Sequence, residues 1–499
     1  MFDFVTLPAG GVFFRFEKKF CNKRWKMYCK SCTIFLFSRR RIYFVMSVTD
    51  MDSERREFRR KRRVRNQALA YISLLLFVAV LAAGTMYLVH RSVNGTTGND
   101  RNIAEAGKDL PEQEETPPLV IEEPDSPDDY PVTDELSPEE QLLNEMIDSY
   151  IGQMTLQEKV AGLFVITPEQ LTGVGTVTAA GQTTKEALED KPVGGLIYFA
   201  KNIRGYDKFK EMLINTVAYS KYPLFLCVDE EGGQISRVAN ALPEVEGIDS
   251  PAVIAQGGEP ANAYEAYARV AAYLNDVGIN VDFAPVADVK TDVNTLFDLR
   301  SFGTDPAAVS EFVSQAVFGL EDSEVSACLK HFPGHGATEG DSETGIAVTE
   351  RTPEEMQNGE FLPFIAGIES GVDFVMVGHI SVPQINGDYV PASISRRVMT
   401  DILRNELGYE GIIITDAMNM KAITDYYPAG EAAVSAVKAG ADMILMPEKY
   451  QEAFDAVLDA VANGEIPEER IDESLRRIYR VKCEKMVVTS YDDIGNDSE

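Results

Sequence analysis

Cysteine is scarce in this chain of 499 residues, since six cysteines are too few and too scattered for a disulfide framework. Cys227 and Cys328 fall inside apolar runs and Cys483 inside a late helical pattern, so we expect buried free thiols at all three positions. Cys29 and Cys32 form a lone CxxC pair with no second pair and no strand–helix–strand context. This pair therefore indicates neither a zinc site nor a redox site.

Positive charge is also scarce, except at the start of the chain. The sequence holds 47 Lys and Arg residues against 79 Asp and Glu residues, which gives a formal net charge of -32. Residues 1–65 carry 18 basic and 6 acidic residues, a local charge of +12, so the remainder carries about -44. Such an acidic body argues against nucleic acid as a partner.

One apolar run, residues 68–89, contains no charged residue and is long enough to span a bilayer. The basic stretch 55–65 precedes the run, and no such cluster follows it, so the positive-inside rule predicts a cytoplasmic N-terminus. A convincing small-residue cleavage site is lacking, which favours an uncleaved signal-anchor over a removed signal peptide. We therefore predict a single-pass protein of the cell membrane whose later residues are extracytoplasmic.

The segments around this run divide the chain further. Residues 1–67 form a basic cytoplasmic segment, of which residues 1–45 lack the composition of a domain, so we predict a natural start at Met46 or Met51. A peptide from residues 1–45 in the mass spectrum of the intact protein would refute that start. Residues 90–136 are acidic and contain proline, which predicts an extended linker. The folded body is predicted over residues 137–486, followed by a charged tail at 487–499.

The body alternates strand-length apolar runs with helical segments. The runs are nearly continuous in hydrophobic residues, as expected for parallel strands that are covered on both faces. Eight such units over this length predict an α/β fold with a single (β/α)8 barrel, without an internal repeat or a second folded domain. The eight predicted strands are residues 160–167, 194–200, 223–230, 279–287, 326–332, 373–380, 411–417 and 442–447.

Polar residues gather where these strands end, which in a barrel is the active face. The third predicted strand ends in Asp229, Glu230 and Glu231, and the fifth contains Lys330 and His331. Further polar strand ends are supplied by Asp288, His379 and Asp416. Any one of these side chains can belong to a structural ion pair, but their agreement across strands indicates a catalytic or binding site.

The residue types limit the chemistry of that site. His331 and His335 have zinc-ligand spacing for a helix, but Pro333 and Gly334 forbid a helix there, so we predict no metal. Neither a phosphate-binding loop nor a dinucleotide fingerprint occurs in the sequence, which predicts no cofactor. Lys330 could form a Schiff base and make the protein a lyase. Carboxylates with Lys, Arg and His neighbours suit glycoside hydrolysis better, because that reaction needs a carboxylate at the anomeric carbon and a second group that protonates the leaving oxygen.

Five stretches of the body resemble glycoside hydrolase family 3, in its branch of bacterial β-N-acetylglucosaminidases. They are VDEEGGQISRV (228–238), LRSFGTD (299–305), KHFPGHG (330–336), GHISVP (378–383) and GIIITDAMNMKAI (411–423). The resemblance spans roughly residues 140–485 and agrees with the predicted barrel. It implies a monomeric exo-glycosidase that removes terminal β-linked N-acetylglucosamine from cell-wall saccharides.

The resemblance also implies roles for particular residues. Asp416 matches the catalytic nucleophile, which gives a retaining mechanism through a covalent glycosyl-enzyme. The hydrogen-bonding set around the sugar matches Asp229, Arg300, Lys330 and His331, and Met420 lines the same pocket. Arg237 and His335 are expected to support the loops of the site.

The sequence departs from the family at the acid/base loop. The family's loop carries Asp-Ser-His or Asp-Thr-His, whereas this chain has Asp341, Ser342 and Glu343. Glu343 can itself be the acid/base with support from Asp341, or Glu339 or another loop carboxylate can serve. The third alternative is that the acid is lost and the protein is a weak enzyme or a non-catalytic saccharide-binding protein at the cell surface.

Overall fold

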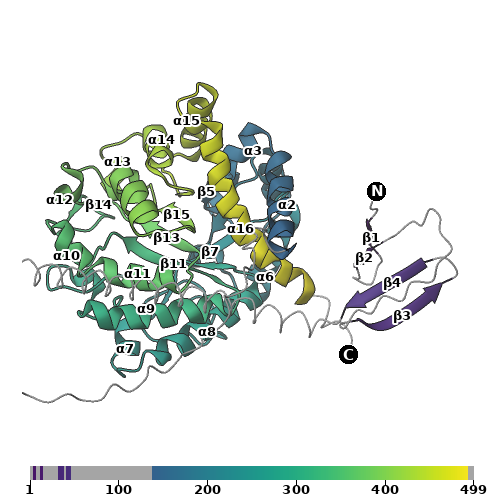
Figure 1. Ribbon diagram of the computed structural model, residues 1–499, viewed down its shortest axis with the longest axis horizontal. Helices are drawn as coiled ribbons and strands as arrows, with labels where there is room; N and C mark the ends of the chain where they lie inside the picture. The colour runs from purple at the N-terminus through teal and green to yellow at the C-terminus, as the bar shows by residue number, and fades with distance from the viewer. Residues whose placement is uncertain (1–3, 7–11, 15–31, 39–40, 47–137, 493–499) are drawn as a thin grey trace, which may run out of the picture. The chain divides into compact units, whose positions relative to one another are not determined.

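The computed structural model describes residues 4–6, 12–14, 32–38, 41–46 and 138–492 (Figure 1). The predicted membrane span 68–89 and the predicted linker 90–136 lie outside these residues. Within the described parts of the chain, no helix is both long and apolar enough to cross a membrane.

The chain divides into two units, Met1–Ser137 and Pro138–Glu499. In the first unit, β1 (Phe4–Thr6) pairs antiparallel with β2 (Val12–Phe14), and β3 (Cys32–Ser38) pairs antiparallel with β4 (Arg41–Met46). The sequence analysis did not predict these strands.

The second unit is a parallel eight-stranded barrel, as predicted. The strands follow one another in the order β15-β13-β11-β10-β7-β6-β5-β16, and a parallel bridge between Ile414 and Met443 brings the two ends of this order together. Each predicted strand run contains one of them. They are β5 (Phe164–Ile166), β6 (Gly195–Ile197), β7 (Phe225–Val228), β10 (Val281–Asp282), β11 (Ser326–Phe332), β13 (Phe374–Val377), β15 (Ile412–Thr415) and β16 (Ile444–Leu445).

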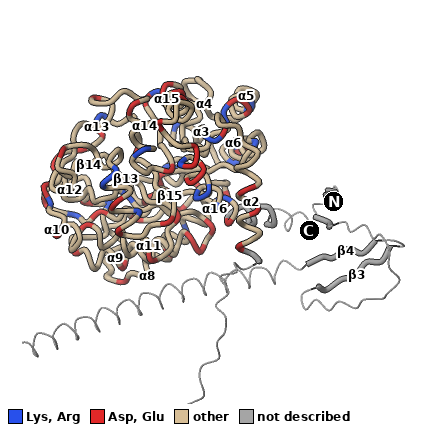
Figure 2. Tube along the Cα trace, turned by 45° about the horizontal axis from the view of Figure 1, so that its top comes forward, with Lys and Arg blue, Asp and Glu red and all other residues tan. Residues whose placement is uncertain are grey.

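Helices cover the outside of this barrel. They are α2 (Pro138–Gly152), α3 (Leu156–Ala161), α4 (Pro168–Thr172), α5 (Gln182–Asp190), α6 (Tyr206–Tyr219), α7 (Pro251–Ala255), α8 (Ala261–Val277), α9 (Pro306–Glu321), α10 (Pro353–Gln357), α11 (Phe361–Glu369), α12 (Pro383–Asn386), α13 (Lys421–Thr424), α14 (Ala429–Ala439), α15 (Tyr450–Ala462) and α16 (Glu468–Asp492). Acidic residues recur all along this unit rather than in one segment (Figure 2). Helix α8 shows why these segments are helical, because its buried Ala263, Tyr267, Val270 and Leu274 recur every three or four residues and form one apolar face.

One predicted strand boundary was wrong. The first predicted strand began at Val160, but Thr155 caps α3 through a reciprocal hydrogen-bonded pair with Glu158, so the helix includes Val160 and Ala161. The segment that precedes β15 contains the π-helix η4 (Arg397–Glu406). The last helix, α16, ends at Asp492.

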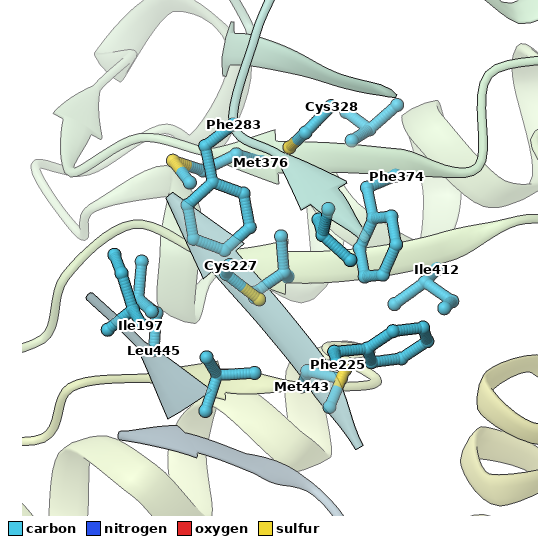
Figure 3. Packing of buried hydrophobic residues seen from close by; sticks show 14 of the residues in the cluster. Ile197, Phe225, Cys227, Phe283, Cys328, Phe374, Met376, Ile412, Met443 and Leu445 are labelled. Carbon is cyan, nitrogen blue, oxygen red and sulfur yellow. The ribbon is translucent and has the colours of Figure 1, made fainter. Parts of the chain in front are cut away.

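The barrel interior is filled by aromatic, aliphatic and sulfur-containing side chains (Figure 3). Phe225 and Phe374 meet edge to face with their ring centroids 5.0 Å apart. Cys227, Cys328 and Cys483 are buried free thiols, as predicted. Burial raises the pKa of the Cys483 thiol to about 11, which keeps this sulfur protonated and unreactive at neutral pH.

Lys482 of α16 reaches the opposite end of the barrel from the predicted site. Its ammonium donates to the carbonyl of Gly194, just before β6, at 2.8 Å, and it lies 4.7 Å from the ring centroid of Phe225 at the start of β7. No carboxylate pairs with it among the described residues, and burial lowers the pKa of Lys482 to about 7.

This depressed pKa makes the stability of the barrel depend on pH. The folded state releases the Lys482 proton near pH 7 and the unfolded state near pH 10.5, so the unfolded state binds more protons between these values. The contribution of Lys482 to the free energy of unfolding should therefore rise by about 3 kcal/mol from pH 7 to pH 10. Chemical unfolding of the protein and of Lys482→Met at both pH values measures the difference. Parallel pH profiles for the two proteins would contradict this prediction.

Candidate active site

Five neighbouring strands bring the predicted site residues to one end of the barrel. In spatial order these strands are β15, β13, β11, β10 and β7. Their carboxyl ends carry, in the same order, Asp416, His379, Lys330 with His331, Asp288, and Asp229. Because parallel strands end at a common edge, residues almost 190 positions apart in sequence become neighbours.

Lys330 is held between two carboxylates. Its Nζ lies 2.8 Å from Oδ1 of Asp229 and 2.7 Å from Oε1 of Glu231, and its side chain is buried. Burial alone lowers the pKa of Lys330, but the two carboxylates outweigh burial and hold this pKa above its ordinary value. A permanently protonated amine is not a nucleophile, so this geometry disfavours the Schiff-base alternative.

Glu231 is a site residue that the sequence analysis placed at a strand end without assigning it a role. Besides Lys330, its carboxylate accepts two parallel hydrogen bonds from Arg300, from Nε and Nη2, both at 2.8 Å. Burial raises the pKa of Glu231, but Lys330 and Arg300 outweigh burial and hold the carboxylate ionised. The run of three acidic residues after β7 was the signal, but sequence does not show which of the three faces the site.

Arg237 contributes a weaker contact to the same group. Its Nη2 lies 3.8 Å from Oδ2 of Asp229, and its guanidinium carbon lies 5.8 Å from the ring centroid of Phe199. Its half-buried side chain thus flanks Asp229 from the position directly after β9 (Ile235–Ser236), which pairs with β8 (Glu230–Gly232). This position is compatible with the supporting role that the resemblance implies.

Asp288 is a second site residue whose role the sequence did not indicate. Its Oδ2 lies 2.7 Å from Nδ1 of His331, and its Oδ1 accepts a hydrogen bond from the backbone N–H of His335 at 2.5 Å. Burial raises the pKa of Asp288, but the two histidines outweigh burial and keep this pKa below its ordinary value. Because an ionised carboxylate accepts hydrogen bonds, the proton lies on Nδ1 of His331 and its Nε2 is left for a ligand.

We expect Asp288→Asn to lower kcat/KM roughly 10- to 100-fold, the usual cost of a lost charge-assisted hydrogen bond. The amide oxygen can accept from only one of the two donors, His331 and the His335 N–H. The amide NH2 group then faces the other donor, and no hydrogen bond forms there. Steady-state kinetics beside thermal unfolding curves measure this change. Unchanged kinetics would show that the Asp288–His331 contact does not orient the ring.

Asp416 lies directly after β15 and is almost fully buried. Its Oδ1 accepts a hydrogen bond from the N–H of Ala417 at 2.7 Å. Burial raises the pKa of Asp416, but His331, His379, the Ala417 N–H and Lys330 together lower it below its ordinary value. Asp416 is therefore an ionised carboxylate that faces cationic and imidazole groups, as a nucleophile of glycoside hydrolysis must be.

His379 fixes the backbone beside Asp416. Its Nε2 lies 2.9 Å from the carbonyl oxygen of Ala417, and its Nδ1 lies 2.7 Å from the hydroxyl of Ser393. Burial lowers the pKa of His379, so the ring is neutral, donates from Nε2 to the carbonyl and accepts from Ser393. Met420, half-buried, follows on the same segment and begins α13.

The loop with the candidate acid/base is anchored through Ser342. The Ser342 hydroxyl lies 3.0 Å from Nε2 of His335, and the Ser342 carbonyl accepts from the N–H of Ala422 in α13 at 3.2 Å. These contacts fit the supporting role predicted for His335. Asp341 accepts from the backbone N–H of Glu343 at 2.9 Å, whereas the side chain of Glu343 is exposed.

Glu339 lies further back on the same loop. Its backbone N–H and carbonyl pair with Val348 at 2.8 and 3.0 Å, which ties this residue to β12 (Ala347–Val348). Ser342, next to Glu343, is instead tied to the segment that follows Asp416. Of the two glutamates, Glu343 is therefore the one whose neighbouring residue contacts the segment that follows Asp416.

The whole barrel matches one family model. The description of that model is the glycosyl hydrolase family 3 N-terminal domain, and it matches residues 146–481. The chain belongs to glycosyl hydrolase family 3. This match includes all five strand ends described above.

Among curated relatives, the chain is similar to Beta-hexosaminidase A of Pseudoalteromonas piscicida, with 30% identity over 60% of this chain and 54% of the relative. It is also similar to a Beta-hexosaminidase of Idiomarina loihiensis, with 32% identity over 60% of this chain and 91% of the relative. The chain thus spans about half the length of the first relative and nearly all of the second.

Among solved structures, a family 3 β-N-acetylglucosaminidase from a Paenibacillus species is similar at a TM-score of 0.62 and 34% identity, over 67% of this chain and 63% of that one. A family 3 member from Mycobacterium smegmatis is similar at a TM-score of 0.59 and 30% identity, over 66% of this chain and 98% of that one. Both similarities agree with the barrel described here.

Proposed function

We propose that this protein is a retaining exo-glycosidase that removes terminal β-linked N-acetylglucosamine from cell-wall fragments or related saccharides. The observation that carries the proposal is Asp416, a buried carboxylate directly after β15 that its neighbours keep ionised despite its burial. Relatives named as beta-hexosaminidases support the choice of sugar. The sugar is therefore part of the proposal for this chain.

The described contacts suggest how the terminal sugar is held. Glu231 joins Lys330 to Arg300, and Lys330 also contacts Asp229 directly, so these four side chains are held in one fixed arrangement. The free Nε2 of His331 adds a further partner for a sugar hydroxyl. This rigidity favours a small, polyhydroxylated ligand in one orientation.

In the proposed mechanism, Asp416 attacks the anomeric carbon while Glu343 gives a proton to the leaving oxygen. A covalent bond forms between the sugar and the Asp416 carboxylate as the glycosidic bond breaks. Water then attacks the anomeric carbon, with Glu343 as general base, and releases the sugar with its original β configuration. Asp341 orients the Glu343 backbone throughout.

An assay of the full chain tests the proposal. Nitrophenyl β-N-acetylglucosaminide and a β-linked N-acetylglucosamine dimer are incubated with the protein, and the first-formed anomer of the released sugar is recorded by NMR. Release of β-N-acetylglucosamine from both substrates is the expected result. Release of the α anomer would overturn the retaining mechanism, and no release from either substrate would overturn the enzyme assignment.

A second candidate is a non-catalytic saccharide-binding protein. The observation that favours it is the exposed Glu343 at the position of the family's histidine. Binding of N-acetylglucosamine without cleavage of either substrate, and equal affinity in Asp416→Asn, would support this candidate.

The cellular location remains a proposal that rests on the sequence. A bilayer span at residues 68–89 would place the barrel outside the cytoplasm, with residues 90–136 as its tether. Extraction of the membrane fraction at alkaline pH tests this, because a spanning protein stays with the lipid. Release of the intact chain into the supernatant would overturn it.

A further inference from the structure

Exposed hydrophobic side chains gather at the carboxyl end of the barrel. Among the described residues, eleven large hydrophobic side chains are exposed, and eight of them lie in segments that follow the carboxyl ends of strands. The other three lie on α2 and α6 and are Leu142, Ile214 and Val217. The eight are Val174, Val253, Val293, Leu296, Leu299, Ile346, Tyr389 and Tyr426.

Tyr389 and Tyr426 differ from the aliphatic members of this set. They are the two aromatic side chains in it, and their exposed fractions are 62% and 58%. Their backbones are nevertheless fixed, since the Tyr389 carbonyl accepts from the Ser381 hydroxyl at 2.8 Å and the Tyr426 N–H donates to the Ile423 carbonyl at 3.0 Å. A fixed backbone with a projecting ring is a preorganised contact surface rather than a loose loop end.

The two tyrosines lie on adjoining segments. Tyr389 is followed by η3 (Ala392–Ile394), which packs against α14, and α14 begins shortly after Tyr426. Asp388 is close enough to Tyr427 to add to the raised pKa of that phenol, after burial. The segments α12, β14 (Ile380–Ser381) and α13 lie together at this end of the barrel in both views (Figures 1 and 2).

The same two segments carry residues of the candidate site. Tyr426 follows α13, whose Ala422 N–H holds Ser342 beside Glu343. Tyr389 lies in the connection after β13, whose His379 holds the Ala417 carbonyl next to Asp416. Both tyrosines therefore lie on segments that also carry residues of the candidate site.

We propose that Tyr389 and Tyr426 form a leaving-group subsite, which binds the saccharide unit beyond the scissile bond. This inference rests on the proposed function and names the part of the substrate that the barrel's rim recognises. A pyranose ring presents a face of C–H groups that packs on an aromatic ring, while phenol hydroxyls at the rim can bond sugar hydroxyls. A tyrosine ring makes such contacts at little entropic cost, because its side chain has only two rotatable angles to fix.

Binding measurements on the full chain test this subsite. Asp416→Asn is used as the background so that the dimer is not consumed, and the dissociation constants of N-acetylglucosamine and of its β-linked dimer are measured by calorimetry. Tyr389→Ala and Tyr426→Ala should each weaken dimer binding roughly 3- to 10-fold and leave monomer binding unchanged. Tyr389→Phe should retain most of the dimer affinity, because the ring is kept.

Ile214→Ala in α6 is the matched control, since it removes an equally exposed apolar side chain away from the carboxyl end. Equal dimer affinity in both tyrosine variants and in the control would overturn the subsite while leaving the proposed function standing. A parallel loss of monomer and dimer affinity would also overturn it, because that pattern is a general disturbance of the site. If the unsubstituted protein neither binds nor cleaves these saccharides, the proposed function fails, and the subsite fails with it.

Discussion

Asp416→Asn should lower kcat for N-acetylglucosaminide hydrolysis by on the order of 10³-fold or more, with the fold intact. The amide oxygen can still accept from the Ala417 N–H, so the local backbone has no reason to move. The amide lacks the negative charge and the nucleophilic oxygen that form the covalent intermediate. The measurement is single-turnover and steady-state kinetics with nitrophenyl β-N-acetylglucosaminide.

Asp425→Asn is the matched control, because Asp425 is an exposed carboxylate just past α13 and the substitution is chemically the same. It should leave kcat within twofold, as is usual for surface changes of this kind. Mass spectrometry after reaction with a slow fluorinated sugar should locate the covalent adduct on a peptide that contains Asp416. Full activity of Asp416→Asn, or an adduct elsewhere, would reject the nucleophile assignment.

Glu343→Ala should have an effect that depends on the leaving group. A sugar alcohol leaves poorly without a proton, so hydrolysis of the dimer should fall by about 10²- to 10⁴-fold. Nitrophenolate leaves without protonation, so formation of the covalent intermediate from the nitrophenyl substrate should change little. The ratio of kcat/KM for the two substrates, measured for both proteins, isolates the acid step from binding.

Glu339→Ala provides the comparison, since both residues are exposed glutamates of one loop. If Glu339→Ala shows the selective loss and Glu343→Ala does not, the acid/base is Glu339. If neither variant changes the ratio, neither glutamate is the acid/base.

The barrel could be predicted from sequence because its strands are buried on both faces. Runs such as residues 411–417 are therefore nearly continuous in hydrophobic residues and stand out from the amphipathic helices around them. The ends of these runs also located Asp416, Lys330 and His331. Strand limits were less predictable, as Val160 shows, because a helix cap at Thr155 decides whether the same apolar residues become helix or strand.

The pairing of each carboxylate of the site with its partners could not be predicted in this way. Asp229, Glu230 and Glu231 are consecutive carboxylates, yet Glu231 binds Lys330 and Arg300 while Glu230 accepts backbone N–H groups of Val238 and Ala239. This difference arises from the alternation of side chains along an extended segment and from the path of β8. Neither can be predicted from the residue types alone.

The buried thiols of the barrel give the protein an internal reporter of opening. Cys227 and Cys328 lie on strands that flank β10, and neither sulfur is reachable while the strands stay paired. Pulse alkylation under native conditions, read peptide by peptide, would therefore measure how often the barrel separates, in the way that hydrogen exchange does for amides. Equal labelling rates at the two positions would mean that this wall opens as one cooperative unit, and unequal rates would show which strand leaves first.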